Sequence, residues 1–126
     1  MDLSQAKAAA YLPVSDLERA TAWYRDRLGA EATQLNEMEA EFVCGDGTSF
    51  FLYPSQFAGT NEGTALALNV DDVEATVADL VSRGVTFEEY DFDDFKTVNG
   101  IATMPDGRKV AWFKDQDGNI IAVGSG

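Results

Sequence analysis

The side chains available for chemistry in this chain of 126 residues are carboxylates, tyrosines and lysines, because the sequence contains no histidine. Ser-His-Asp and Cys-His nucleophilic systems are therefore excluded. Zinc sites built from several His or Cys ligands are excluded too, since Cys44 is the only cysteine. We interpret Cys44 as a small buried hydrophobe, and we expect that any bound cation would need oxygen ligands alone.

The densest group of oxygen donors is "DQDGN", residues 115–119, near the end of the chain. It does not fit a calcium loop, because its glycine comes too early and no glutamate follows at the closing position. Asp-Gly-Asn is instead typical of a tight turn between two strands. We therefore expect these acids at a hairpin tip, and we expect the apolar strand after them to line any site.

The net charge of the chain favours some classes of binding partner over others. With 22 acidic and 9 basic residues, the formal net charge is −13, which would repel nucleic acid and anionic membranes and attract a cationic small molecule. Acidity that serves only solubility is the alternative. One cysteine permits no internal disulfide, no apolar run reaches the roughly 20 residues of a membrane span, and the start lacks a secretory pattern. We expect a cytoplasmic protein.

The strand and helix that would position these side chains occur twice in the sequence. "LPVSDLERATAWYRDRLGAE" from Leu12 and "LNVDDVEATVADLVSRGVTFEE" from Leu68 align on Val14 and Val70. Each copy predicts a strand followed by a helix that ends at a glycine, Gly29 or Gly84. We expect Ser15 and Asp71 to cap these helices, with a glutamate three residues later. The other matched pairs are Asp16 with Asp72, Glu18 with Glu74, Ala22 with Ala78 and Arg27 with Arg83.

Short strands are predicted after each helix. We expect them over residues 31–37, 39–45 and 48–54 in the first half, and over 85–91, 100–104, 108–114 and 119–124 in the second. Residues 54–63 form the expected linker. The predicted fold class is α+β, with two strand-helix-strand-strand-strand modules whose helices cover one face of each sheet.

These segments resemble a known family. "LPVSDLERATAWYRDRLG", "VDDVEATVADLVSRGV" and "GRKVAWFKDQDGNIIAV" are similar to the two modules and closing hairpin of the glyoxalase, bleomycin-resistance and extradiol-dioxygenase superfamily, the vicinal oxygen chelate proteins. The resemblance implies one domain, 1–126, of two βαβββ modules (6–57 and 64–126) in pseudo-two-fold arrangement. Their curled mixed sheet would surround a cleft, and the protein would be a homodimer.

The same resemblance implies where a metal would be held. The positions that carry ligands in metal-using members fall at Ala9, Phe51, Ala65 and Ala122. Methyl groups and a phenyl ring have no lone pairs for a metal. We therefore expect no metal and no cofactor, which argues against the usual chemistry of the superfamily.

Strand alternation then predicts what faces the cleft. Tyr11 shares a face with Ala9, Tyr53 with Phe51, Asn69 with Ala65, and Ile120 with Ala122. We add Trp112 in preference to Phe113, and Tyr90 from an acidic, aromatic segment over residues 88–100 that could form a lid. Glu39 and Glu41 would favour a cation in a cleft, or would form a solvated face. The ligand-binding residues expected are Tyr11, Phe51, Tyr53, Asn69, Tyr90, Trp112 and Ile120.

The function predicted is binding of a small cationic molecule in an aromatic, acidic cleft without metal. This is the manner of bleomycin-binding resistance proteins, which hold a bulky cationic drug in grooves at the dimer edge. A metal-independent isomerase or lyase is the alternative, followed by a metal-dependent lyase or dioxygenase with atypical ligands. A dimerising module whose aromatics fill the cleft is a further alternative. We assign no catalytic residue, and the interpretation leans away from an enzyme.

Overall fold

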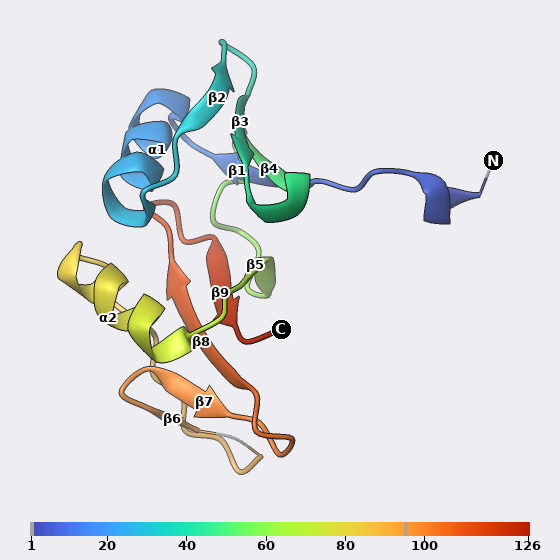
Figure 1. Ribbon diagram of the computed structural model, residues 1–126. Helices are drawn as coiled ribbons and strands as arrows, with labels where there is room; N and C mark the ends of the chain where they lie inside the picture. Colours follow the sequence, from blue (N-terminus) through green and yellow to red (C-terminus); the bar gives the residue numbers. More distant parts are fainter. Residues whose placement is uncertain (1, 95) are drawn as a thin grey trace.

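Two mixed sheets carry their helices on the same side (Figure 1). The computed structural model describes residues 2–94 and 96–126. The first sheet has the order β1-β4-β3-β2, and the second has the order β5-β9-β8-β7-β6. Within each sheet the first and last strands of a module are parallel neighbours, β1 with β4 and β5 with β9. The predicted α+β fold class is confirmed. The strands are β1 (Ala10–Val14), β2 (Ala32–Leu35), β3 (Ala40–Val43), β4 (Ser49–Pro54), β5 (Thr64–Asn69), β6 (Thr97–Val98), β7 (Ile101–Thr103), β8 (Lys109–Lys114) and β9 (Ile120–Gly124).

The helices form where the apolar stripes predict them. Helix α1 (Leu17–Trp23) continues into one turn of π-helix, η2 (Tyr24–Leu28), and α2 (Val73–Ser82) occupies the same place in the second module. Gly29 and Gly84 follow the two helices with positive φ angles of 71° and 94°, which a residue without Cβ adopts at little cost. Short 3-10 turns lie at η1 (Leu3–Gln5) and η3 (Gly45–Gly47).

The predicted helix caps are wrong by one residue. Asp16, not Ser15, caps α1, because its carboxylate accepts from the backbone N–H of Arg19 at 3.1 Å. Asp72 caps α2 in the same way through the N–H of Ala75. The hydroxyl of Ser15 donates instead to Asp117, 102 residues further along, at 2.6 Å.

The two modules share one core under their helices. One cluster of buried residues includes members of α1, of α2 and of both sheets, so the helices join the modules as well as cover them. The ring of Trp23, on α1, lies 6.4 Å from the ring of Phe113 on β8. The fully buried side chains include Leu12, Val14, Tyr24, Phe42, Leu52, Phe113 and Ile121.

The strand predicted over residues 85–91 is wrong. Only isolated bridges occur there, Phe87 with Phe113 and Asp91 with Lys96. After Phe87, the N–H of Glu88 still donates to the carbonyl of Trp112 on β8, and the carboxylate of Glu89 accepts from Thr97 Oγ1 and from the N–H of Gly100. The two-residue strand β6 takes the place next to β7.

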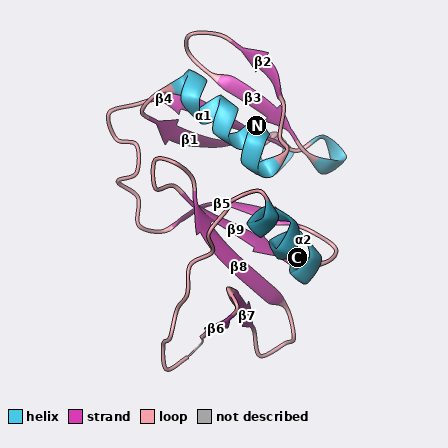
Figure 2. Cartoon of the chain, turned by 90° about the vertical axis from the view of Figure 1, so that its left-hand side faces the viewer, coloured by secondary structure: helices cyan, strands magenta, loops and turns pink. Residues whose placement is uncertain are grey.

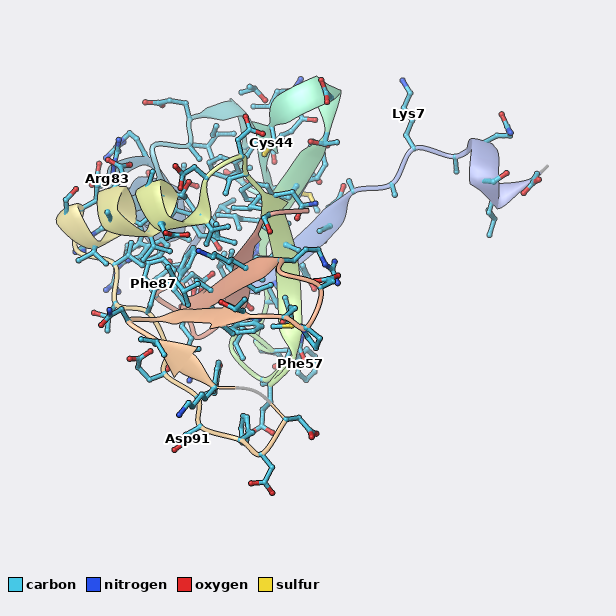
Figure 3. The ribbon with its side chains drawn as sticks, turned by 60° about the horizontal axis from the view of Figure 1, so that its bottom comes forward. Lys7, Cys44, Phe57, Arg83, Phe87 and Asp91 are labelled. Atoms are coloured by element: carbon cyan, nitrogen blue, oxygen red, sulfur yellow. The ribbon has the colours of Figure 1, made fainter. Side chains whose placement is uncertain are left out.

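Several exposed segments project from this body. Residues 2–9 run away from the sheets as an arm that carries Lys7 (Figures 1 and 3). The loop that carries Asp91 lies at the far end from Cys44 (Figure 3). No helix in the part of the chain that the structure describes is long and apolar enough to cross a membrane.

Candidate functional site

The open face of the first sheet displays a stacked pair of aromatic rings. Tyr11 on β1 lies opposite Phe51 on β4, and their ring centroids are 4.6 Å apart with planes 5° from parallel. Tyr53, two residues along β4, meets Tyr11 edge to face at 6.1 Å. Because alternate residues Leu12 and Val14 are buried under the helices, Tyr11 points the other way and stays 52% exposed. A flat apolar surface is thereby left open to solvent.

A carboxylate stands beside this pair. Glu41 on β3 is the direct cross-strand neighbour of Phe51. Thr33 Oγ1 donates to Glu41 Oε1 at 3.2 Å, which limits the positions that the carboxylate adopts. Glu39 comes two residues earlier, and alternation places it on the same face. Aromatic faces and carboxylates both attract positive charge, so this arrangement favours a cation that can stack.

The open face of the second sheet has a different surface shape. Ala67, Ala122 and Trp112 lie side by side on β5, β9 and β8, so two methyl groups border one indole. Tyr90 meets Trp112 edge to face at 5.5 Å, and Phe92 stacks on Tyr90 at 5.8 Å. A hollow of about 120 Å³ adjoins this row; its lining includes Ala67, Asn69, Val110 and Ala122.

The seven predicted ligand-binding residues thus fall into separate places. The ring of Tyr11 contacts those of Phe51 and Tyr53, and Tyr90 and Trp112 form a second contact group. Asn69 lines the small hollow, whereas Ile120 lies at the opposite end of β9, beside Lys114. Among the described residues, no ring contact joins the first group to the second.

The positions expected for metal ligands do not offer a donor set. Strand pairing places Tyr11, not Ala9, beside Phe51, and Ala67, not Ala65, beside Ala122. None of these side chains has a carboxylate, imidazole or thiolate. Within residues 2–94 and 96–126, no three Asp, Glu or Cys side chains gather in a way that could hold a metal ion. The residues present do not fit the metal that the superfamily implies.

The closing hairpin holds a buried network that the sequence did not reveal. Asp115 is only 5% exposed, and its carboxylate accepts from four donors. These are the hydroxyl of Tyr24 at 2.7 Å, Asn119 Nδ2, and the backbone N–H groups of Asp117 and Asn119. Asn119 Nδ2 also donates to the carbonyl of Pro13 at 2.8 Å. These acids lie in the turn between β8 and β9, as predicted, but Asp115 is buried there and joins the hairpin to the first module.

Burial and the adjacent Asp115 carboxylate raise the pKa of Tyr24 well above its ordinary value of 10.0. A raised pKa in the folded state means that stability is complete below about pH 10 and falls as the pH rises further. We expect the free energy of unfolding to drop by up to about 1.4 kcal/mol per pH unit there. Urea unfolding at pH 8, 10 and 11 measures this slope.

Tyr24→Phe supplies the comparison for this pH dependence. The variant should be less stable at neutral pH by about 1–2 kcal/mol, because Asp115 loses one donor. Above pH 10 its stability should fall less steeply than that of the parent, because the group that titrates is gone. Parallel curves for the two proteins would contradict the role assigned to Tyr24.

Comparisons with known proteins agree with this fold. The sequence profile described as Glyoxalase/Bleomycin resistance protein/Dioxygenase superfamily matches residues 6–123. The chain belongs to this superfamily. Among curated proteins, the comparison gave no match.

Solved structures with the same fold cover nearly the whole chain. A glyoxalase / bleomycin resistance protein from Catenulispora acidiphila is 28% identical, with 94% of this chain and 96% of that chain covered and a TM-score of 0.68. A superfamily member from Sphaerobacter thermophilus is 26% identical, with 94% of each chain covered and a TM-score of 0.68. A bleomycin resistance determinant encoded on transposon Tn5 is 17% identical, with 95% and 97% covered and a TM-score of 0.72, which supports the fold alone.

Proposed function

We propose that this protein binds a small, flat, cationic molecule on its open aromatic face, without a metal ion. The observation that carries the proposal is the stacked Tyr11–Phe51 pair, half exposed beside Glu41. A planar ligand would bury the exposed ring of Tyr11, and its charge would lie near the carboxylate. The net charge of −13 adds a long-range attraction for cations.

A second copy of the chain would complete the site in this proposal. The Tyr11 group and the Trp112 group make no ring contact with each other within the described residues of one copy. Both lie on sheet faces that the helices leave uncovered. In a homodimer, the Tyr11 face of one copy and the Trp112 face of its partner would enclose a ligand from two sides. A ligand held this way would be sequestered from solvent, which is the binding role proposed here.

The descriptions of related proteins are consistent with this proposal. The superfamily includes bleomycin resistance proteins by its description, and the Tn5 relative is described as a resistance determinant. The lack of metal donors at the expected positions supports binding without a metal ion in this proposal. Metal independence, the cytoplasmic setting and the dimer remain predictions.

Ethidium, a planar fluorescent cation, tests the proposed face. We expect its fluorescence to rise on binding, whereas fluorescein, a planar anion, should bind far more weakly. Tyr11→Ala should weaken ethidium binding about tenfold, because stacking and cation–π contacts are worth about 1–2 kcal/mol. The measurement is a fluorescence titration at low salt.

The matched control for Tyr11 is Phe57→Ala, since Phe57 is a linker aromatic that is 62% exposed. This variant should bind ethidium as the parent does. Equal losses in both variants would mean that any exposed ring serves, and the proposed face would be rejected. Tighter binding of fluorescein than of ethidium would reject the charge preference.

A further inference from the structure

A groove lies on the helix side of the molecule, away from the open sheet face that carries Tyr11 and Phe51. Helix α2 has 10 residues and is therefore about 15 Å long, whereas the second sheet has five strands. The helix packs on β8 and leaves β6 and β7 beyond its edge (Figure 2). The uncovered part forms a groove of about 650 Å³ between α2 and these strands. That volume is within the range of about 300–1,000 Å³ that small-molecule sites occupy.

The floor of this groove is apolar. Val98 on β6 pairs directly with Ile101 on β7, so their side chains lie next to each other. Val77 and Ala78 of α2 form the opposite wall. Val98 is 65% exposed, although it is an apolar residue of the edge strand β6. An apolar ligand body would cover this surface.

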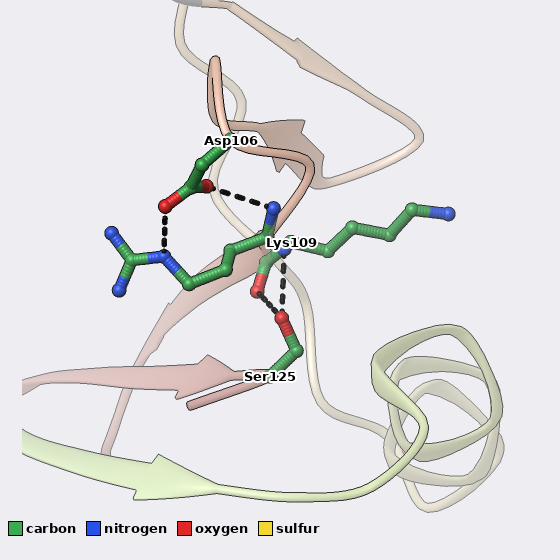
Figure 4. Close-up of polar contacts among 4 residues, drawn as sticks. Asp106, Lys109 and Ser125 are labelled. Carbon is green, nitrogen blue, oxygen red and sulfur yellow. Dashed lines mark hydrogen bonds and ion pairs between the residues drawn. The ribbon is translucent and has the colours of Figure 1, made fainter.

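The charged groups around the groove favour an anion. Lys96 and Lys109 line it and are two of the four lysines in this acidic chain. The ammonium of Lys109 pairs with Glu74, and its backbone is held by Ser125 (Figure 4). Lys96 is exposed and makes no ion pair with any carboxylate that the structure describes. The groove lining thus holds two ammonium groups and one carboxylate, and Asp91 lies across the backbone bridge from Lys96.

We propose that this groove binds an amphiphilic monoanion, a molecule with an apolar chain and a single carboxylate. The chain would lie along Val77, Val98 and Ile101, and the carboxylate would pair with Lys96. Asn99 and Thr103 at the groove could donate further hydrogen bonds to the carboxylate. A dianion is disfavoured by Glu74 and by the acidic surface around it. This site is independent of the cation-binding face, because the two surfaces share no residue.

Decanoate, kept below its micelle concentration, is the probe for the intact chain. In amide-resolved NMR titrations at low salt, decanoate should shift the amide signals of Val98 and Ile101. Decan-1-ol, with the same chain and no charge, should bind about fivefold more weakly, the effect of one exposed ion pair. Decyltrimethylammonium should bind no better than the alcohol.

Single substitutions distinguish the contribution of the ligand's carboxylate from that of its apolar tail. Lys96→Gln should reduce decanoate affinity about fivefold and leave decan-1-ol unchanged, whereas Val98→Ser should weaken both probes. Lys7→Gln, on the projecting arm, should change neither. Decanoate shifts confined to Tyr11 or Trp112, unchanged affinity in Lys96→Gln, or tighter binding of the cationic probe would each overturn the proposal. Lys96 is exposed, so its replacement should leave the melting temperature unchanged. An unchanged melting temperature will show that the variant is folded.

Discussion

Replacing Asp115 with alanine should lower the free energy of unfolding by about 3–5 kcal/mol, a large loss for a domain of this size. The carboxylate is the shared acceptor of four donors, and the substitution leaves the hydroxyl of Tyr24 and Asn119 Nδ2 without it in the interior. A buried donor without a partner costs more than the lost hydrogen bond alone contributes. Urea unfolding at pH 7 measures the difference.

Asp106→Ala is the matched control for this prediction. Asp106 precedes a glycine in another turn, and its carboxylate accepts from the backbone N–H of Arg108 at 3.0 Å, but it is exposed (Figure 4). Its loss should cost about 0.5–1 kcal/mol, because water replaces the missing acceptor. If both variants lose the same stability, the buried network does not join the modules as described. Asp115→Asn should fall between the two, since one acceptor oxygen remains.

Gly59→Ala should destabilise the protein by about 2–4 kcal/mol. Gly59 lies in the linker between the modules with φ of 75°, where a Cβ atom is strained. An added Cβ would also overlap the backbone carbonyl oxygen of Asp117 in the closing hairpin. Backbone cannot move aside as a side chain can, so the linker or the hairpin must shift.

Gly47→Ala isolates the contribution of that contact. Gly47 has nearly the same φ, 74°, but an added Cβ would meet nothing within 4 Å. It should lose only about 1 kcal/mol, the cost of the backbone conformation. Thermal or urea unfolding compares the two variants. A loss at Gly59 no larger than that at Gly47 would show that the linker does not pack on the hairpin in solution.

Both predictions concern the same joint of the molecule. The linker turn and the β1 strand meet the closing hairpin through Gly59, Ser15 and Pro13. Pro13 is two residues from Tyr11, so this joint also supports the strand that carries the proposed ligand-binding ring. Variants that loosen the joint without unfolding the chain should therefore weaken ethidium binding as well.

The sequence by itself determined the fold class and the faces on which the residues of the first strand lie. The repeat, the helical stripes and the alternation of Leu12 and Val14 with Tyr11 are local patterns, and they follow directly from the periods of helix and strand. The absence of donors at Ala9, Phe51, Ala65 and Ala122 was also readable, once the resemblance to the superfamily had assigned those positions.

Only the tertiary structure decided which of these residues meet. The contacts of Tyr24 with Asp115, Ser15 with Asp117 and Pro13 with Asn119 join residues about a hundred positions apart, which no local period encodes. The same holds for the separation of Tyr11 from Trp112 and for the groove beside α2, which depends on how far one helix reaches across a sheet. Side-chain hydrogen bonds and uncovered surfaces arise from packing between elements, so they become visible only when those elements are in place.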